Sequence, residues 1–377
     1  MMNSGAEKRL WPVFLLGVLA IFLSVPNAQA QSTKDLPPPP PLWKPKPTPT
    51  PKPVVPDVID SSDVIRTNSN LVMVPVSVTD QTGQAVQGLK VEDFRLEEEG
   101  KQQQISGIGD PEQVPLAIAL LFDISSSTSQ KGFFASQQNA AATFLRLVMK
   151  PTDRAAIFTI TGKPTMVQPL ASAEASSAKM LSIPAATTSV PTAFYDTVTA
   201  AAKYLTTAPS NFRRVIVVLS DGDDNFSEQI RDQSLADYRA TTGGQQSALG
   251  TRTGLLNAHQ RAVASVQKSV QQADVIFYSV NPGGPSIKLN LIAMRAERGM
   301  ETIAAATGGT AFVPDSDQDL ERVFRQVAAE LRGQYLLQYY GNSEAPASQF
   351  RRITVAVPAR NDVRVRARQG YYPKKQD

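Results

Sequence analysis

The pattern of apolar and polar positions first indicates β-structure, between residues 69 and 108. Valine occupies every second position from Val72 to Val78, which is the period-two pattern of a strand. Phe94 and Leu96 precede a Glu-Glu-Gly turn and a further short strand, so a hairpin is predicted there. The stretch offers too few strands to bury a good core alone. We therefore expect it to form half of a small β-sandwich.

From residue 113 the pattern changes to apolar strands that alternate with amphipathic helices. Strands are predicted at 116–122, 155–161, 214–219, 275–280 and 309–313. Apolar positions at helical spacing predict helices over 130–149 and 317–333. This alternation is typical of an α/β doubly wound, mostly parallel sheet. Residues 228–256 break the rhythm with a polar, glycine-containing stretch, which is expected to be a long surface loop.

Strand patterns return after residue 334, at 335–340, 353–358 and 363–372. Neither flanking β region is complete alone, so we expect 63–112 and 335–377 to be two halves of one small β-sandwich. The α/β domain, 113–334, would be inserted between them. The last strand alternates apolar residues with Arg364, Arg366 and Arg368. We interpret the arginines as a solvated strand face, and polyanion binding is the alternative.

The N-terminal region has the features of an export signal followed by a spacer. Lys8 and Arg9 precede an apolar run of about 15 residues and an A-x-A end, which predicts a signal peptide over 1–30 with cleavage near Ala30. The alternative is a retained membrane anchor, for which the run is short. Residues 31–62 contain a stretch with eleven of the 28 prolines and are expected to form an extended linker. The predicted location is extracytoplasmic, either periplasmic or secreted.

Composition narrows the chemistry that the 377 residues can perform. The chain has no cysteine and a single histidine, His259, so thiolate chemistry and multi-histidine zinc sites are excluded. A net charge of +4 is too small to indicate nucleic-acid binding. No segment after the first thirty residues is long and apolar enough to predict a membrane span. Oligomeric state is left open by these observations.

Side-chain oxygens follow the predicted strands at three places. Asp123, Ser125 and Ser127 follow the first strand of the α/β region, and Asp221 follows strand 214–219. Thr192 precedes a further helix between them. Ligands of doubly wound sheets bind at the carboxyl ends of the strands, so these oxygens are expected to meet. Two carboxylates with hydroxyls suit a hard cation such as Mg²⁺, with Mn²⁺ or Ca²⁺ as alternatives. Neutral hydroxyls leave the ion able to attract a further carboxylate.

This set of residues resembles the metal-ion-dependent adhesion site (MIDAS) of von Willebrand factor type A (VWA) domains. The resemblance spans roughly residues 113–334, and the flanking sequences are similar to secreted acidobacterial VWA-related proteins. It implies that two serines and one aspartate bind the metal directly, and that the threonine and second aspartate bind directly or through water. It departs from the family at Pro191, because glycines often precede the threonine there, and the proline stiffens this loop.

Three functions compete on these observations. The first is an exported module for protein–protein interaction and adhesion, which captures an Asp or Glu carboxylate of a partner protein through the bound metal. The second is a polyanion-binding structural protein that relies on the arginine stripe. The third is a metal-dependent hydrolase. Against the hydrolase, Ser125 stands where a phosphatase with an aspartyl nucleophile needs a second aspartate, and no G-x-S-x-G motif is present. The prediction is a non-enzymatic binding protein.

Overall fold

The computed structural model describes residues 71–125, 134–242, 248–285, 290–316, 319–341, 346 and 348–373. They belong to one compact unit, Arg66–Asp377. The predicted signal peptide and proline-rich linker, 1–62, lie outside the described residues. None of the helices within the described residues is long and apolar enough to span a membrane.

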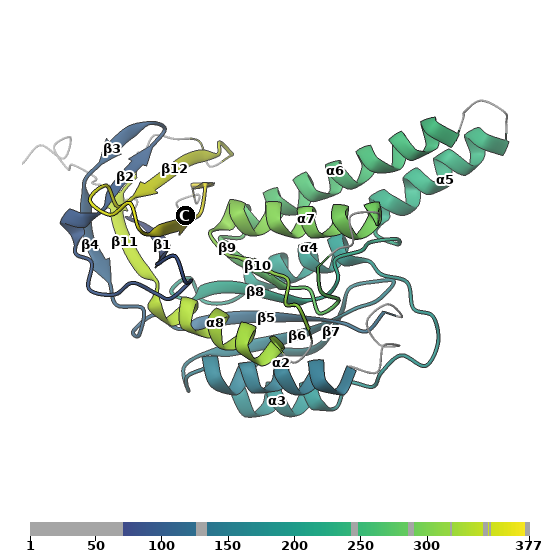
Figure 1. Ribbon diagram of the computed structural model, residues 1–377, viewed down its shortest axis with the longest axis horizontal. Coiled ribbons are helices and arrows are strands. Elements are labelled where there is room, and N and C mark those ends of the chain that lie inside the picture. Colours follow the sequence, from purple (N-terminus) through teal and green to yellow (C-terminus); the bar gives the residue numbers. More distant parts are fainter. Residues whose placement is uncertain are drawn as a thin grey trace, which may run out of the picture. The chain divides into compact units, whose positions relative to one another are not determined.

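A six-stranded sheet in the order β10-β9-β8-β5-β6-β7 forms the centre of the α/β part (Figure 1). Its strands are β5 (Leu116–Asp123), β6 (Arg154–Ile160), β7 (Thr165–Ala171), β8 (Arg213–Leu219), β9 (Val275–Val280) and β10 (Ala311–Phe312). All neighbours pair in parallel except β6 and β7. The predicted α/β doubly wound, mostly parallel sheet is confirmed. The sequence did not indicate β7, because this half-exposed edge strand contains Pro169 and lacks clear alternation.

Helices cover both faces of this sheet. One face carries α2 (Phe134–Val148), α3 (Ala173–Leu181) and α8 (Leu320–Gly333), and the other carries α4 (Phe194–Leu205), α6 (Ala248–Gln272) and α7 (Leu291–Thr307) (Figure 1). Side chains alternate across a strand, so Leu120 packs into one core and Leu121 into the other. Every residue of β5 is buried, which explains why its sequence is an unbroken apolar run.

The described residues of the polar stretch 228–256, which are 228–242 and 248–256, are helical, so the predicted long loop is wrong. It contains α5 (Glu228–Thr242) and the first part of α6, which form an antiparallel helical hairpin that extends beyond the sheet (Figure 1). Gly254 lies where a Cβ would come within 2.9 Å of the Gln233 side chain, so the two helices approach closely there. Only Ile230 and Asp237 of α5 are buried. With so little of the helix buried, no apolar stripe exists to reveal it in the sequence.

The flanking strands form two four-stranded sheets, β13-β1-β11-β4 and β14-β12-β2-β3. Their bounds are Leu71–Thr79 (β1), Arg95–Glu98 (β2), Lys101–Gln103 (β3), Ile105–Gly109 (β4), Tyr335–Tyr340 (β11), Arg351–Ala356 (β12), Arg364–Ala367 (β13) and Gly370–Tyr371 (β14). Strand β1 pairs antiparallel with both β11 and β13. Strand β2 pairs with β12 and β3. Strands from before and after the α/β part therefore share both sheets and bury one common core that includes Val74, Leu96 and Leu337.

Two local expectations about these strands have different outcomes. The predicted hairpin exists as β2 and β3, and Glu99 and Gly100 at its turn both have positive φ, as a type I′ hairpin turn requires. The arginine stripe is not a simple solvated face. Arg366 lies 2.8 Å from the buried Glu330 of α8, and Arg368 pairs with Asp274. The interpretation was wrong for these two residues because the strand end faces the α/β part rather than water.

Asp153 connects three separate segments of the α/β part. Its buried carboxylate accepts hydrogen bonds from the backbone N–H of Leu116 at 2.8 Å and of Lys150 at 2.8 Å. It also accepts one from the Arg332 guanidinium at 2.7 Å. The side chain thus joins the start of β5, the turn before β6 and the end of α8.

We expect Asp153→Asn to lower the free energy of unfolding by about 3 kcal/mol, because an amide donor would face other donors and leave a charge unpaired. Asp362→Asn is the matched control, because the Asp362 side chain is 57% exposed in its ion pair with Arg360. Because solvent screens this exposed ion pair, Asp362→Asn should leave the free energy of unfolding nearly unchanged. Urea denaturation of both variants measures the difference, and equal effects would contradict this role of Asp153.

Candidate metal site

The candidate site lies at the carboxyl ends of β5 and β8, which are neighbours in the sheet. Phe122 near the end of β5 pairs with Leu219 at the end of β8. The chain runs from β5 outward to β6 and β7, then returns to β8 on the other side of β5. The strand order reverses at this point, and ligands of doubly wound sheets bind at such a reversal. Asp123 is the last residue of β5, and Asp221 lies two residues after the end of the adjacent strand β8.

Asp123 is almost completely buried, with 1% of its surface exposed. Its Oδ2 accepts a hydrogen bond from the Ser220 hydroxyl at 2.5 Å, and its Oδ1 accepts one from the Ser125 backbone N–H at 2.8 Å. Burial, with a smaller contribution from the negative charge of Asp221, raises the pKa of Asp123 to about 6 despite these hydrogen bonds. The two carboxyl groups are thus close enough to repel one another.

The turn after β8 brings Asp221 to this point and needs a glycine. Gly222 has a φ of +74°, which L side chains rarely adopt. A Cβ at this position would lie 2.8 Å from the Met300 side chain of α7. Ser220 holds the turn from within, because its hydroxyl accepts the Gly222 N–H at 3.0 Å while donating to Asp123. A larger residue at position 222 would displace the Asp221 loop.

The loop that carries Thr192 is hydrogen-bonded to the loop that carries Asp221. The Thr192 N–H donates to the Asn225 side chain at 2.9 Å. The Thr192 carbonyl accepts the N–H groups of Asn225 and Phe226 at 3.1 and 3.0 Å. The next residue, Ala193, donates to the carbonyl of Thr161 just after β6. Thr192, which is 4% exposed, is therefore fixed beside the ends of the central strands.

The described residues thus bring together most of the predicted donors. Asp123 and Ser125 are adjacent, Asp221 acts electrostatically on Asp123, and Thr192 is tied to the Asp221 loop. Ser127 lies outside the described residues. The assignment of these five residues as ligands stays a prediction.

The site contains two further residues that are not among the predicted donors. Ser220 is fully buried and orients Asp123 through the 2.5 Å hydrogen bond. Asp224 lies in a polar turn of a kind that usually faces solvent, yet it is 2% exposed and accepts hydrogen bonds from Tyr195, Phe226 and Ser227. Neither role has a sequence signal, because serine and aspartate are also the ordinary residues of exposed turns.

The donor set fits a small hard cation better than a thiophilic or histidine-bound metal. Within the described residues, no three His, Cys, Asp or Glu side chains gather as a metal-binding group. The candidate oxygens here are instead two carboxylates and neutral hydroxyls. A divalent cation would offset the repulsion between Asp123 and Asp221, and hydroxyls would complete its shell without cancelling its charge. The residues present therefore fit Mg²⁺ or a similar ion.

His259 has the packing role that its position on a helix indicates. It is 2% exposed, and its Nδ1 lies 3.2 Å from the Tyr195 hydroxyl. Burial, with a smaller contribution from the positive charge of Arg295, lowers the pKa of His259 to about 4. The ring is therefore neutral at physiological pH and supports the first turn of α4 from behind.

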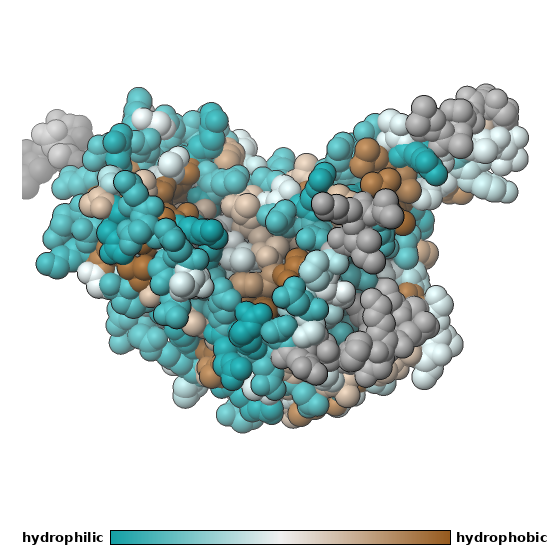
Figure 2. Space-filling model, in the orientation of Figure 1, coloured by the Kyte–Doolittle hydropathy of each residue, from teal (hydrophilic) through white to brown (hydrophobic). Residues whose placement is uncertain are grey.

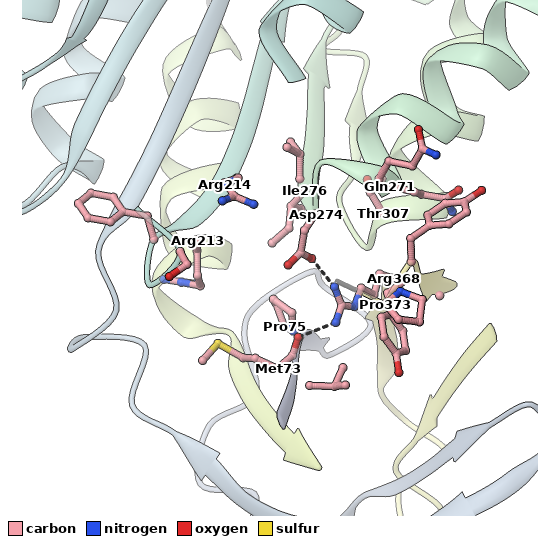
Figure 3. Close-up of a pocket in the computed structure, with 18 of the residues that line it drawn as sticks. Met73, Pro75, Arg213, Arg214, Gln271, Asp274, Ile276, Thr307, Arg368 and Pro373 are labelled. Carbon is pink, nitrogen blue, oxygen red and sulfur yellow. Dashed lines mark hydrogen bonds and ion pairs between the residues drawn. The ribbon is translucent and has the colours of Figure 1, made fainter. Parts of the chain in front are cut away.

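A cavity of 410 Å³ lies at the opposite edge of the sheet, near the starts of β8 and β9. Arg368 reaches across it, paired with Asp274 and donating to the Met73 carbonyl at 2.8 Å (Figure 3). Figure 2 shows apolar residues gathered in the depression between the flanking strands and the α/β part. The cavity lies at the starts of β8 and β9, whereas the candidate metal site lies at the carboxyl ends of β5 and β8, so the two sites are separate. Arg368, which crosses the cavity, already forms an ion pair with Asp274.

No protein-family model matches the chain, and no curated protein does. Similar solved structures include a von Willebrand factor type A protein from Catenulispora acidiphila, at 14% identity and a TM-score of 0.41 over 71% of this chain and 51% of that one. They also include proximal thread matrix protein 1 from the mussel byssus with a zinc-occupied MIDAS motif. It is 16% identical, with a TM-score of 0.38 over 62% of this chain and 49% of that one. The chain thus spans about half the length of these two proteins.

The raised pKa of Asp123 predicts a pH-dependent stability cost in the metal-free protein. The folded state keeps this proton up to about pH 6, whereas the unfolded chain loses it near 3.8. The free energy of unfolding should therefore fall as the pH rises from about 4 to 6, and the cost should be complete above that range. Asp123→Asn removes the titrating carboxyl group and keeps nearly the same side-chain shape.

We expect metal-free Asp123→Asn to be more stable than the wild type by about 2–3 kcal/mol at pH 7, with the gap closing below about pH 4. Urea denaturation in the presence of a chelator measures both values. Asp362→Asn, at an exposed carboxylate, is the control and should show no such gain. A difference between Asp123→Asn and wild type that does not change with pH would contradict the assigned titration.

Gly222→Ala should impair the site more than the same change at another glycine with positive φ. Gly88 has a φ of +84° and nothing within 4 Å of the point where a Cβ would lie, so Gly88→Ala carries only the backbone cost of about 1 kcal/mol. Gly222→Ala adds the contact with Met300 and displaces the Asp221 loop. We expect a several-fold loss of Mg²⁺ affinity in calorimetry for Gly222→Ala alone. An equal loss in both variants would count against this assignment.

Proposed function

We propose that the protein is a metal-dependent binding module that captures an acidic group of a partner protein. The observation that carries this proposal is the buried Asp123 carboxyl group, on which the charge of the partly buried Asp221 acts, at the switch point of the sheet with hydroxyl residues around it. Asp123, Ser125, Ser127, Thr192 and Asp221 are the proposed ligands, and Mg²⁺ is the proposed ion. When bound, the ion supplies a positively charged coordination position that an outside carboxylate can occupy.

The chain's own residues prepare this position in three ways. Two hydrogen bonds orient the Asp123 carboxylate: the Ser220 hydroxyl donates to Oδ2, and the Ser125 N–H donates to Oδ1. Gly222 allows the tight turn that presents Asp221. The neutral hydroxyls of Ser125 and Thr192 keep the negative charge of the site low, which favours binding of an acidic ligand over storage of the metal. Replacing either hydroxyl by a carboxylate would weaken attraction of the partner.

We also propose the setting in which this module works. Residues 1–30 act as a signal peptide and 31–62 as a linker, so the site operates outside the cytoplasm. Residues 63–112 and 335–377 form one small β-sandwich around the α/β domain, 113–334. The pairing of β1 with β11 and β13 supports this division. The ion pair of Arg366 with the buried Glu330 and the pairing of Arg368 with Asp274 weigh against the alternative of a polyanion-binding stripe.

Calorimetry with MgCl₂ and MnCl₂ on the purified protein tests the metal site directly. We expect one bound divalent ion per chain in the wild type and none in Asp123→Asn, which removes a charged ligand without unfolding the metal-free protein. A partner should then be retained on immobilised wild-type protein, released by chelator, and not retained by Asp123→Asn. Absence of Mg²⁺ and Mn²⁺ binding, or retention that survives chelator, would overturn the proposed function.

A further inference from the structure

Helix α4 begins without a capping side chain of its own. Its N-cap residue is Ala193, which makes no side-chain hydrogen bond. The first N–H groups of a helix have no partner within the helix and need an outside acceptor when they are buried. Asp224 supplies one, because its Oδ2 accepts the Tyr195 N–H at 2.8 Å. A carboxylate at this end also interacts favourably with the helix dipole.

The same network caps the next helix in return. Ser227 donates its hydroxyl to Asp224 Oδ2 at 2.5 Å and accepts the Asp196 N–H from the first turn of α4 at 3.1 Å. Asp196 in turn accepts the N–H of Glu228, the first residue of α5, at 3.0 Å. The starts of α4 and α5 therefore cap each other through Asp224, Ser227 and Asp196. This reciprocal capping joins the Thr192 loop to the Asp221 loop.

Asp224 also shapes the Asp221 loop from within. Its Oδ1 accepts the N–H groups of Phe226 and Ser227 at 3.1 and 2.9 Å. These bonds close the turn that contains Asn225, the residue after Asp224. The Asn225 side chain accepts the hydrogen bond from the Thr192 N–H. Asp224 is 2% exposed, and its hydrogen bonds from the Tyr195 N–H, the Ser227 N–H and the Ser227 hydroxyl are buried. Its neighbour Asp223 is different, with a side chain that is 35% exposed and lies 3.5 Å from Arg295.

We propose that Asp224 is a positioning residue of the metal site. It caps α4 from the Asp221 loop and so holds Thr192 and Asp221 at a fixed separation before any metal binds. The expected effect on metal affinity rests on the proposed function, whereas the capping of α4 by Asp224 does not depend on it. Because Asp224 acts through backbone contacts to the Thr192 loop, its effect on affinity depends on Thr192 being a ligand.

The test compares Asp224→Asn with Asp223→Asn, which removes the same charge one residue away. Asn at 224 puts an NH₂ donor in place of one acceptor oxygen. In place of Oδ2 it removes the acceptor of the Tyr195 N–H and the Ser227 hydroxyl, and in place of Oδ1 that of the Phe226 and Ser227 N–H groups. Asn at 223 leaves these four bonds intact. Calorimetry with MnCl₂ should show at least tenfold weaker binding for Asp224→Asn and less than threefold for Asp223→Asn. Equal losses would overturn the proposal, because they would indicate long-range attraction by charge alone.

Combining each change with Thr192→Ala separates positioning from a general loss of structure. If Asp224 acts through Thr192, Asp224→Asn should cost less than threefold in the Thr192→Ala background but still tenfold in the Ser125→Ala background. A tenfold cost in both backgrounds overturns the proposal. If Asp224→Asn does not fold, Ser227→Ala replaces it as the milder variant, with a several-fold loss expected and an unchanged affinity counting against the proposal.

Amide hydrogen exchange in the metal-free protein tests the capping independently of metal binding. The N–H groups of Thr192 and Tyr195 should exchange at least tenfold faster in Asp224→Asn than in wild type or Asp223→Asn. Unchanged exchange overturns the proposed positioning even if the metal binds. If the wild type binds no metal but this exchange accelerates, the proposed function has failed while the capping is correct.

Discussion

The burial of the Asp123 carboxyl group beside Asp221 is the constraint on which the site depends. A buried acid next to a second acid is unfavourable, and the raised pKa of Asp123 expresses that cost. The surrounding structure must therefore hold the group in place by other means. Ser220 and the Ser125 N–H do so directly, and the paired ends of β5 and β8 fix the backbone on either side. An arrangement that is costly without a cation is well suited to bind one.

The loops around this point are ordered by each other rather than by the sheet alone. Thr192 comes from the segment before α4, and Asp221 from the segment after β8. Hydrogen bonds of Asn225, Asp224, Ser227 and Asp196 connect these segments or close the turns within them. The ligand positions are therefore prepared by a second layer of residues. Pro191 and Phe226 add to this layer, because both pack closely against Gly162. A Cβ at position 162 would lie 2.9 Å from the Pro191 side chain and 3.3 Å from the Phe226 ring.

The sequence predicted the α/β architecture well, because buried parallel strands leave unbroken apolar runs that need no tertiary information. The five strands that it located are all present. It failed where burial is partial or tertiary contacts decide. Helix α5 has almost no buried face, so its helical pattern was invisible. Arg366 looks solvated in a strand pattern, yet it pairs with Glu330 from a helix that precedes it in the chain.

The same distinction applies to the site. Asp123, Ser125 and Asp221 could be located because they directly follow strands that the pattern identifies. Asp224 could not be interpreted correctly, because its importance comes from the N–H of Tyr195, which lies 29 residues away in the chain. Short polar turns contain the same residue types whether they face water or a neighbouring helix. The ligands thus have a local signal, and the residues that hold them do not.

The position of β1 within its sheet has a mechanical consequence. It lies between β11 and β13, antiparallel to both, with six residue pairs on one side and four on the other. Tension on the chain ahead of Leu71 would pull β1 along its own axis, so both ladders would be loaded in shear. Bonds loaded in shear must break nearly together, whereas a peeled edge strand loses them one at a time. The chain therefore enters this part of the fold through a strand that resists extraction.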